Sequence, residues 1–217
     1  MTVNLIDYMG NDLTVVNAAR VSFDKRHGQL EHNDKGLINY LAKHNHWSPF
    51  AHCSVSYRIK APIFVARQLQ KHQVGLAWNE VSRRYVKSTP EFWDAEDGWR
   101  EAVDDKKQGS GGQSPHQREM MRSIEIVNKT CLNHYRQALD MGICEEQARA
   151  LLPQSMLTEW YWSGSLYAFS RVCNLRLSKD AQQETRKICL TIDKICASLF
   201  PLSWAALMKR NFEIGEG

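Results

Sequence analysis

Several patterns that would assign a protein to a membrane or secreted class are missing from this sequence of 217 residues. No apolar run approaches the roughly 18–20 residues that are needed to cross a bilayer, so we predict no membrane association. The opening segment, MTVNLIDYMGND, lacks the basic and then apolar pattern of a secretion signal, and a cytoplasmic protein is expected. Hydrophobic residues make up 43% and charged residues 24%, which is typical of a single folded domain with a substantial core.

Metal-binding and activated-cysteine patterns are also missing. The six cysteines form no C-x-x-C pair, which argues against zinc, and we expect them to be buried thiols. His44, His46 and His52 lie close together, but their spacing is not the i, i+4 spacing of ligands on a helix, so no metal is predicted. His52 directly precedes Cys53, yet neighbours in a strand point to opposite faces, so we predict no activated cysteine nucleophile.

The common nucleotide and hydrolase motifs are missing as well. The sequence has no G-x-G-x-x-G, no G-x-x-x-x-G-K-[ST] and no G-x-S-x-G, so dinucleotide-binding, P-loop and hydrolase folds receive no support. It also has no obvious pair of catalytic carboxylates. The net charge of +4 suits anionic small molecules and is too weak to indicate binding of duplex nucleic acid.

What the sequence does contain predicts an α+β fold. Alternating apolar residues predict strands over residues 2–8 and 53–60, and an aromatic run predicts another over 158–162. Helical periodicity predicts several helices: a short one that Asp12 caps, then 36–44, one that begins near Pro62, 116–141, 145–152, 165–177, 179–200 and 202–210. The composition of KKQGSGGQSP predicts a flexible loop at about 104–115. We find no second domain boundary and expect one domain over 1–217.

The longest predicted helix, 116–141, carries an apolar stripe, and we expect nearly all of its residues to pack in the core. Its members are Met120, Ile124, Val127, Cys131, Leu132, Tyr135 and Leu139.

The span from Ala61 to Tyr85 is the most distinctive part of the chain, because it holds five cationic side chains, counting its histidine, against one acid. Helical spacing would place four residues on one face, with an end at Gly75: Arg67, Gln68, Lys71 and His72. The following GLAWNEVSRRY is expected to be a loop whose backbone N–H groups and arginines can meet an anion. The span therefore predicts a surface for a polar, planar and negatively charged ligand.

Five separated stretches now carry a family resemblance. Taken in order, these stretches resemble the flavin-dependent thymidylate synthase family. They are GNDLTVVNAARVSFD, KHNHWSPFAH, KAPIFVARQLQKHQ with NEVSRRY, ARALLPQ and NLRLSKDAQQE. The resemblance runs from residue 10 to about 185. It implies an α+β domain with a small, largely antiparallel sheet and several long helices. It also implies methylation of dUMP to dTMP, with FAD as cofactor, NADPH as reductant and methylene-tetrahydrofolate as carbon donor.

The family signature is Arg-His-Arg, then seven residues, then Ser, and this chain departs from it. An ungapped match places Lys71, His72 and Gln73 on the three positions, and eight residues then precede Ser82. Counting back from Ser82 instead would lose the central histidine. We therefore prefer the first register, with one extra residue in the segment 74–78. The change from two arginines to Lys and Gln weakens bidentate phosphate binding.

The resemblance implies roles for individual residues. Arg176 would stabilise the activated uracil in place of a cysteine nucleophile, and Arg84 would bind the dUMP phosphate. The implied substrate-binding residues are Gln68, Lys71, Glu80, Ser82, Arg83, Arg84, Arg149 and Arg176. The implied flavin-binding residues are Ser22, Ser48, Lys71, His72, Gln73, Glu80, Ser165 and Arg171, with asparagines more usual in the family around the last two. The family also implies a homotetramer whose active sites are shared between subunits.

Two rival hypotheses remain open. One is a related flavoenzyme that acts on another deoxypyrimidine monophosphate, which the Lys71 and Gln73 substitutions motivate. The other is a non-catalytic nucleotide- or RNA-binding module that uses Arg83, Arg84 and the tryptophans and tyrosines as stacking surfaces. No repeated basic and aromatic pattern supports the second, and we predict no nucleic-acid partner.

Overall fold

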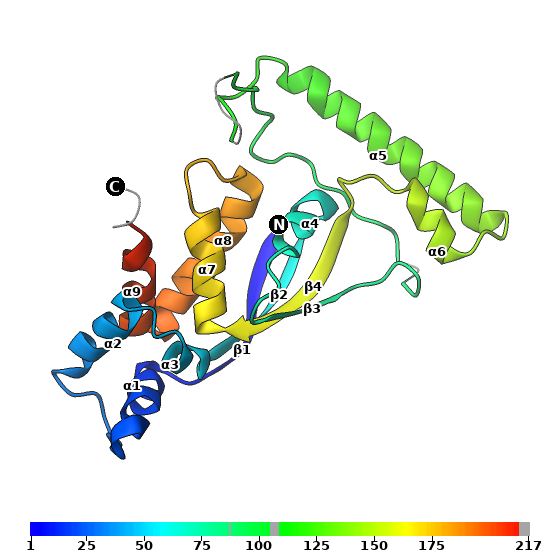
Figure 1. Cartoon of the computed structure of the whole chain (residues 1–217). Helices are drawn as coiled ribbons and strands as arrows, with labels where there is room; N and C mark the ends of the chain where they lie inside the picture. The colour runs from blue at the N-terminus through cyan, green and yellow to red at the C-terminus, as the bar shows by residue number, and fades with distance from the viewer. Residues whose placement is uncertain (87, 105–108, 213–217) are drawn as a thin grey trace. The chain divides into compact units, whose positions relative to one another are not determined.

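The computed structural model describes residues 1–86, 88–104 and 109–212, and within them it has the expected α+β architecture (Figure 1). The strands are β1 Thr2–Met9, β2 Ser54–Pro62, β3 Leu76–Glu80 and β4 Leu157–Ser165. The helices are α1 Asp12–Arg20, α2 Asp34–Lys43, α3 Ser48–Ala51, α4 Ile63–Leu69, α5 Gln117–Asp140, α6 Glu145–Ala148, α7 Leu166–Arg176, α8 Gln183–Leu199 and α9 Pro201–Phe212. Short 3₁₀ turns occupy Val21–Phe23 and Arg149–Leu151. Residues 105–108 of the expected flexible loop lie outside the described residues.

The four strands form one sheet in the order β1-β2-β4-β3. β2 and β4 are antiparallel, because the N–H of Leu166 donates to Cys53 O at one end and the N–H of Ile63 donates to Met156 O at the other. The expectation that GLAWNEVSRRY is entirely a loop is wrong, since its first half is β3. Strand β3 pairs with β4 although its sequence, LAWNE, does not alternate cleanly between apolar and polar residues.

Contacts divide the chain into two compact units whose segments interleave along the sequence. The first unit comprises Met1–Thr2, Ile59–Lys71 and Asn79–Trp160. The second comprises Val3–Arg58, His72–Trp78 and the chain from Tyr161 onward. Each unit is described separately below.

The core of the second unit is aromatic. The ring of Phe169 on α7 packs edge-on against Tyr57 and Trp162, at centroid distances of 5.1 Å and 5.2 Å. Trp78 also packs edge-on against Trp162, at a centroid distance of 5.6 Å. Helices α7 and α8 also lie side by side in this unit (Figure 1). This packing makes α7 a firm support for the polar residues that it carries.

Asp12 has a different role from the expected one. The N-cap of α1 is Asn11, whose side chain accepts the N–H of Thr14. The carboxylate of Asp12 is buried and accepts the backbone N–H groups of Leu202 and Ser203, at 2.9 Å and 2.8 Å. These N–H groups belong to the first turn of α9, where a negative charge is favourable. Asp12 therefore ties α1 to α9, and no local sequence pattern could have indicated this.

We expect Asp12→Ala to lower the free energy of unfolding by about 3 kcal/mol, because it leaves two N–H groups at a partly buried helix end without their charged acceptor. Thermal or urea denaturation of the full chain measures the loss. Asp140→Ala, which removes an exposed carboxylate at the end of α5, is the control and should change stability by less than about 0.5 kcal/mol. Equal stability of the two variants would contradict the role of Asp12.

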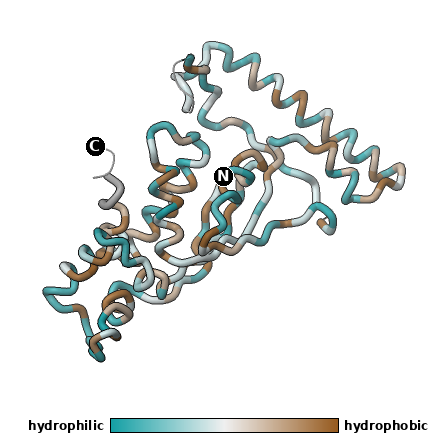
Figure 2. Tube along the Cα trace, in the orientation of Figure 1, coloured by the Kyte–Doolittle hydropathy of each residue, from teal (hydrophilic) through white to brown (hydrophobic). Residues whose placement is uncertain are grey.

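Helix α5, in the first unit, is amphipathic as expected, and Figure 2 shows hydrophobic and hydrophilic residues alternating along it. Tyr135 is the buried residue of its predicted stripe. Met120 and Val127 are 36% and 45% exposed, so the expectation that they pack in the core is wrong. The reason is that periodicity reveals an apolar face but not what covers it.

Candidate functional site

The central contact of the second unit's candidate site joins two predicted residues that lie far apart in the sequence. The guanidinium of Arg176, at the end of α7, donates from Nε to Nε2 of His72 at 2.9 Å. His72 does not lie on a helix face with Arg67 as expected, because α4 ends at Leu69. His72 instead follows a turn, which allows its ring to meet α7.

Close backbone packing fixes the end of the segment that carries His72. Gly75 has φ +77°, and its carbonyl accepts the N–H of Ser165 at 3.3 Å. A Cβ at Gly164 would lie only 2.4 Å from that carbonyl oxygen, so β4 needs a glycine there. Ser165 also caps α7, since its Oγ accepts the N–H of Ala168. The predicted flavin residue Ser165 thus helps to join this segment to the start of α7.

The electrostatics of this site favour neutral His72. Partial burial lowers the pKa of His72, and the nearby positive charges of Arg176 and then Arg171 lower it further. Among the described residues, neither arginine has a carboxylate within ion-pair distance. The site therefore carries two guanidinium charges, and a bound anion would pair favourably with them.

The other predicted residues of the second unit are exposed: Ser22, Ser48 and Gln73. Ser48 begins α3, which packs against α7. Its neighbour Trp47 is 56% exposed, and its ring lies 6.3 Å from that of Tyr167 on α7. Tyr167 precedes Arg171 by four residues, so the two share one face of α7. The sequence interpretation had not singled out Trp47 or Tyr167, although a tryptophan directly before Ser48 was a usable signal.

Predicted substrate residues in the first unit form a second group around the end of β3. The carboxylate of Glu80 accepts the hydroxyl of Thr158 at 2.6 Å. Just after it, Ser82 Oγ accepts both the backbone N–H and the side-chain Nε of Arg84, at 3.3 Å and 3.0 Å. The guanidinium of Arg84 also lies 4.9 Å above the ring of Tyr85. These contacts hold Arg84 in an exposed position suited to an anionic group.

The remaining predicted substrate residues differ in their environment. Arg83 donates from Nη1 to the carbonyl oxygen of Ser88 and so fastens its own loop. Arg149 donates from Nε to Glu146 O at 3.1 Å and is exposed at the end of α6. Gln68 is half-buried on α4, and Lys71 is exposed.

The clustered histidines lie among aromatic contacts. The ring of Tyr40 lies 4.3 Å from that of His44 and 6.0 Å from that of His46, which is stacked on it. Among the described residues, no group of three His, Cys, Asp or Glu side chains could hold a metal ion. Within residues 1–86, 88–104 and 109–212, no helix is long and apolar enough to cross a bilayer.

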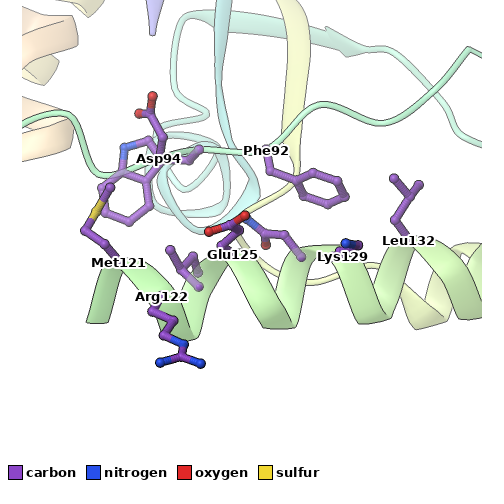
Figure 3. A pocket seen from close by; sticks show the side chains of 10 residues that line it. Phe92, Asp94, Met121, Arg122, Glu125, Lys129 and Leu132 are labelled. Carbon is purple, nitrogen blue, oxygen red and sulfur yellow. The ribbon is translucent and has the colours of Figure 1, made fainter. Parts of the chain in front are cut away.

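A separate hollow lies in the first unit beside α5. Its volume is about 610 Å³, within the usual range of small-molecule pockets. Figure 3 shows the ring of Phe92 standing over α5, with Leu132 on one side and Met121 on the other, while Arg122 points away. None of the predicted site residues lines this hollow.

The cysteines bear on the type of chemistry. Burial, followed by the charge of Asp12, raises the pKa of Cys53 to about 12, so its thiol is not ionised at neutral pH. The expectation of buried thiols is confirmed for Cys53, Cys173, Cys189 and Cys196, and it is wrong for Cys144, which is exposed.

We expect Cys53→Ala to keep the activity of the protein within about twofold of normal, because a protonated and buried thiol is a poor nucleophile. Steady-state rates of the purified variant, together with its circular dichroism spectrum, check this. A folded variant without turnover would show that the chemistry depends on this thiol.

Comparisons with known proteins identify the family to which the chain is similar. Residues 4–202 match the family model described as thymidylate synthase complementing protein. The flavin-dependent thymidylate synthase of Thermus thermophilus is 36% identical over 211 residues, which cover 97% of this chain and 77% of the relative. That of Thermosipho africanus is 34% identical and covers 95% of this chain and 90% of the relative. The solved structure of the UMP/dUMP methylase PolB from Streptomyces cacaoi, bound with 5-Br dUMP, matches with a TM-score of 0.85 and 30% identity, over 96% of this chain and 94% of that one.

Proposed function

The chain belongs to the flavin-dependent thymidylate synthase family, and we propose that it methylates dUMP to dTMP with bound FAD. In this proposal methylene-tetrahydrofolate supplies the carbon and NADPH the reducing equivalents. The observation that carries the proposal is the Arg176–His72 contact, because it provides an oriented cation beside a neutral imidazole.

The second unit suits an anionic, aromatic dinucleotide such as FAD. The guanidinium groups of Arg171 and Arg176 can pair with anionic groups, and the exposed ring of Trp47 beside Tyr167 offers a stacking surface. Ser22, Ser48, His72, Gln73 and Ser165 would complete the flavin site of this unit, and the family resemblance implies further flavin contacts for Lys71 and Glu80. When bound, FAD supplies hydride transfer from NADPH to the transferred carbon.

Arg176 would act directly on the substrate. A guanidinium held beside the pyrimidine favours negative charge on the ring as ring carbon C5 or C6 is attacked. This electrostatic stabilisation would take the place of activation by a cysteine. The protonated state of Cys53 supports a mechanism without a thiolate. The family resemblance implies that Arg84 and Ser82 bind the phosphate of dUMP and that Gln68, Lys71, Glu80, Arg83 and Arg149 are further substrate-binding residues.

We also propose that the chain forms one functional domain and assembles as a homotetramer with shared active sites, as the family resemblance implies. The exposed apolar residues of α5 support burial of this helix against another copy.

The deciding experiment measures NADPH oxidation by the purified protein with and without dUMP, followed by identification of the nucleotide product by mass spectrometry. The proposal predicts a yellow, FAD-containing protein and dUMP-dependent formation of dTMP. A colourless protein that cannot take up FAD, or an unchanged dUMP pool, would overturn it. Colourless protein that binds RNA would instead support the binding-module hypothesis.

One observation favours a second substrate. The structural relative from Streptomyces cacaoi is a UMP/dUMP methylase, so UMP should be offered in the same assay. A kcat/KM for UMP equal to or above that for dUMP would reassign the physiological substrate while keeping the reaction class.

A further inference from the structure

We propose that His72 is a positioning residue for Arg176. Nε2 of His72 accepts the Nε–H of the guanidinium and so holds the guanidinium in the orientation that the pyrimidine requires. The role in catalysis rests on the proposed function, whereas the contact itself can be tested without any substrate. The family resemblance implied only that His72 lies near the flavin.

The geometry of the contact leaves the rest of the guanidinium available. Arg176 has five N–H donors in a rigid, planar fork, and His72 uses the one on Nε. The two terminal amino groups on Nη1 and Nη2 take no part in this hydrogen bond and can meet the ligand. A long arginine side chain has considerable rotamer entropy, so fixing it in advance makes its later encounter with the pyrimidine more productive.

The contact also specifies the tautomer of His72. The Nε of arginine is always a donor, so Nε2 of His72 must be the acceptor, and the proton of the neutral ring lies on Nδ1. A histidine that served only as a flavin contact would have no such preference imposed by Arg176.

Protonation of His72 would break the contact in two ways. It would remove the acceptor lone pair on Nε2 and would place an imidazolium beside the charged groups that face it, Arg176 and Arg171, both on α7. Because burial and these two charges lower the pKa of His72, the neutral form and the contact persist at neutral pH. Both are lost as the pH falls through that lowered pKa, so the contact fails on the acid side.

The first test is spectroscopic and uses the full chain without dUMP. With ¹⁵N-labelled histidine, the His72 resonances should report an unprotonated Nε2 and a protonated Nδ1 at neutral pH. In Arg176→Ala, the pKa of His72 should rise and the preference for the Nδ1–H tautomer should weaken. Identical titration and tautomer in wild type and variant would overturn the proposal, whatever reaction the protein catalyses.

The second test separates positioning from packing by two substitutions at one place. His72→Ala should lower kcat for dTMP formation roughly tenfold, with a smaller change in KM for dUMP, because the guanidinium loses its fixed orientation. His72→Gln offers an amide oxygen that accepts Nε–H but does not titrate. It should recover most of the lost kcat and should remove the contribution of His72 to the acid limb of the pH–kcat profile.

His134→Ala, at an exposed position on α5, is the matched control. This variant should have the same kcat and the same pH profile as the wild type. Equal losses in His72→Ala and His72→Gln, with the wild-type acid limb retained in both, would show that His72 only fills space. Absence of dUMP methylation in the wild type would refute the proposed function instead, and the spectroscopic test would still decide the contact.

Discussion

Arg176→Ala is expected to lower the rate of dTMP formation by roughly 10²–10³-fold while the protein still binds FAD. The guanidinium acts on charge that develops during the reaction, so its removal should reduce kcat more than it weakens flavin binding. The low reactivity of Cys53 removes an obvious alternative way to activate the pyrimidine. Flavin content from absorbance and single-turnover formation of dTMP measure the two effects separately.

Two further variants sharpen this test. Arg176→Lys keeps a positive charge but lacks the planar fork, so it should recover little activity, because it can neither make the Nε–H contact with His72 nor present two parallel donors. Arg136→Ala, at an exposed position on α5, should leave the rate unchanged. A nearly normal rate in Arg176→Ala would remove the proposed role of this residue.

The strands and helices that the sequence predicted well are those whose pattern reflects their burial. β2 alternates buried and less buried residues along most of its length, and its sequence alternates in the same way. β3 escaped prediction because LAWNE is mostly exposed and pairs through its backbone, which leaves no periodic signal. Helix α5 was placed correctly, but the burial of its stripe depends on neighbours that periodicity cannot identify.

The candidate site was predictable in its residue types but not in its contacts. The cationic character of the span 61–85 and its family resemblance made His72, Ser82 and Arg84 candidates from the sequence alone. The partner of His72 is Arg176, 104 residues further along the chain, and only the folded sheet and α7 bring them together. The helical arrangement expected for Lys71 and His72 failed because a helix end depends on local backbone geometry that side-chain spacing does not determine.

The same limit applies to Asp12. Its position before an apolar helical pattern is typical of an N-cap, yet Asn11 takes that place and leaves the Asp12 carboxylate for a helix 190 residues away. Local sequence rules identify candidates for a cap, whereas the tertiary fold decides which helix a buried carboxylate serves.

Arg84→Ala is expected to raise KM for dUMP by about 10²-fold with a smaller effect on kcat, because it removes a charged group that would bind the phosphate in ground state and transition state alike. The structure supports this role, since Ser82 and the ring of Tyr85 hold the guanidinium of Arg84 at an exposed position. Arg83→Ala should have a smaller effect on KM, because Arg83 already donates to the carbonyl of its own loop at Ser88.

Deoxyuridine, which lacks the phosphate, isolates the contribution of Arg84. Wild type and Arg84→Ala should use this nucleoside with equally poor efficiency, because the arginine then has no partner on the substrate. Arg84→Lys should recover part of the affinity for dUMP, since a single ammonium keeps the charge but not the bidentate geometry. If Arg84→Ala weakened the use of dUMP and of deoxyuridine equally, the residue would act on the loop or the ring rather than on the phosphate. The anion-binding role of the segment after β3 would then have to be assigned to another side chain.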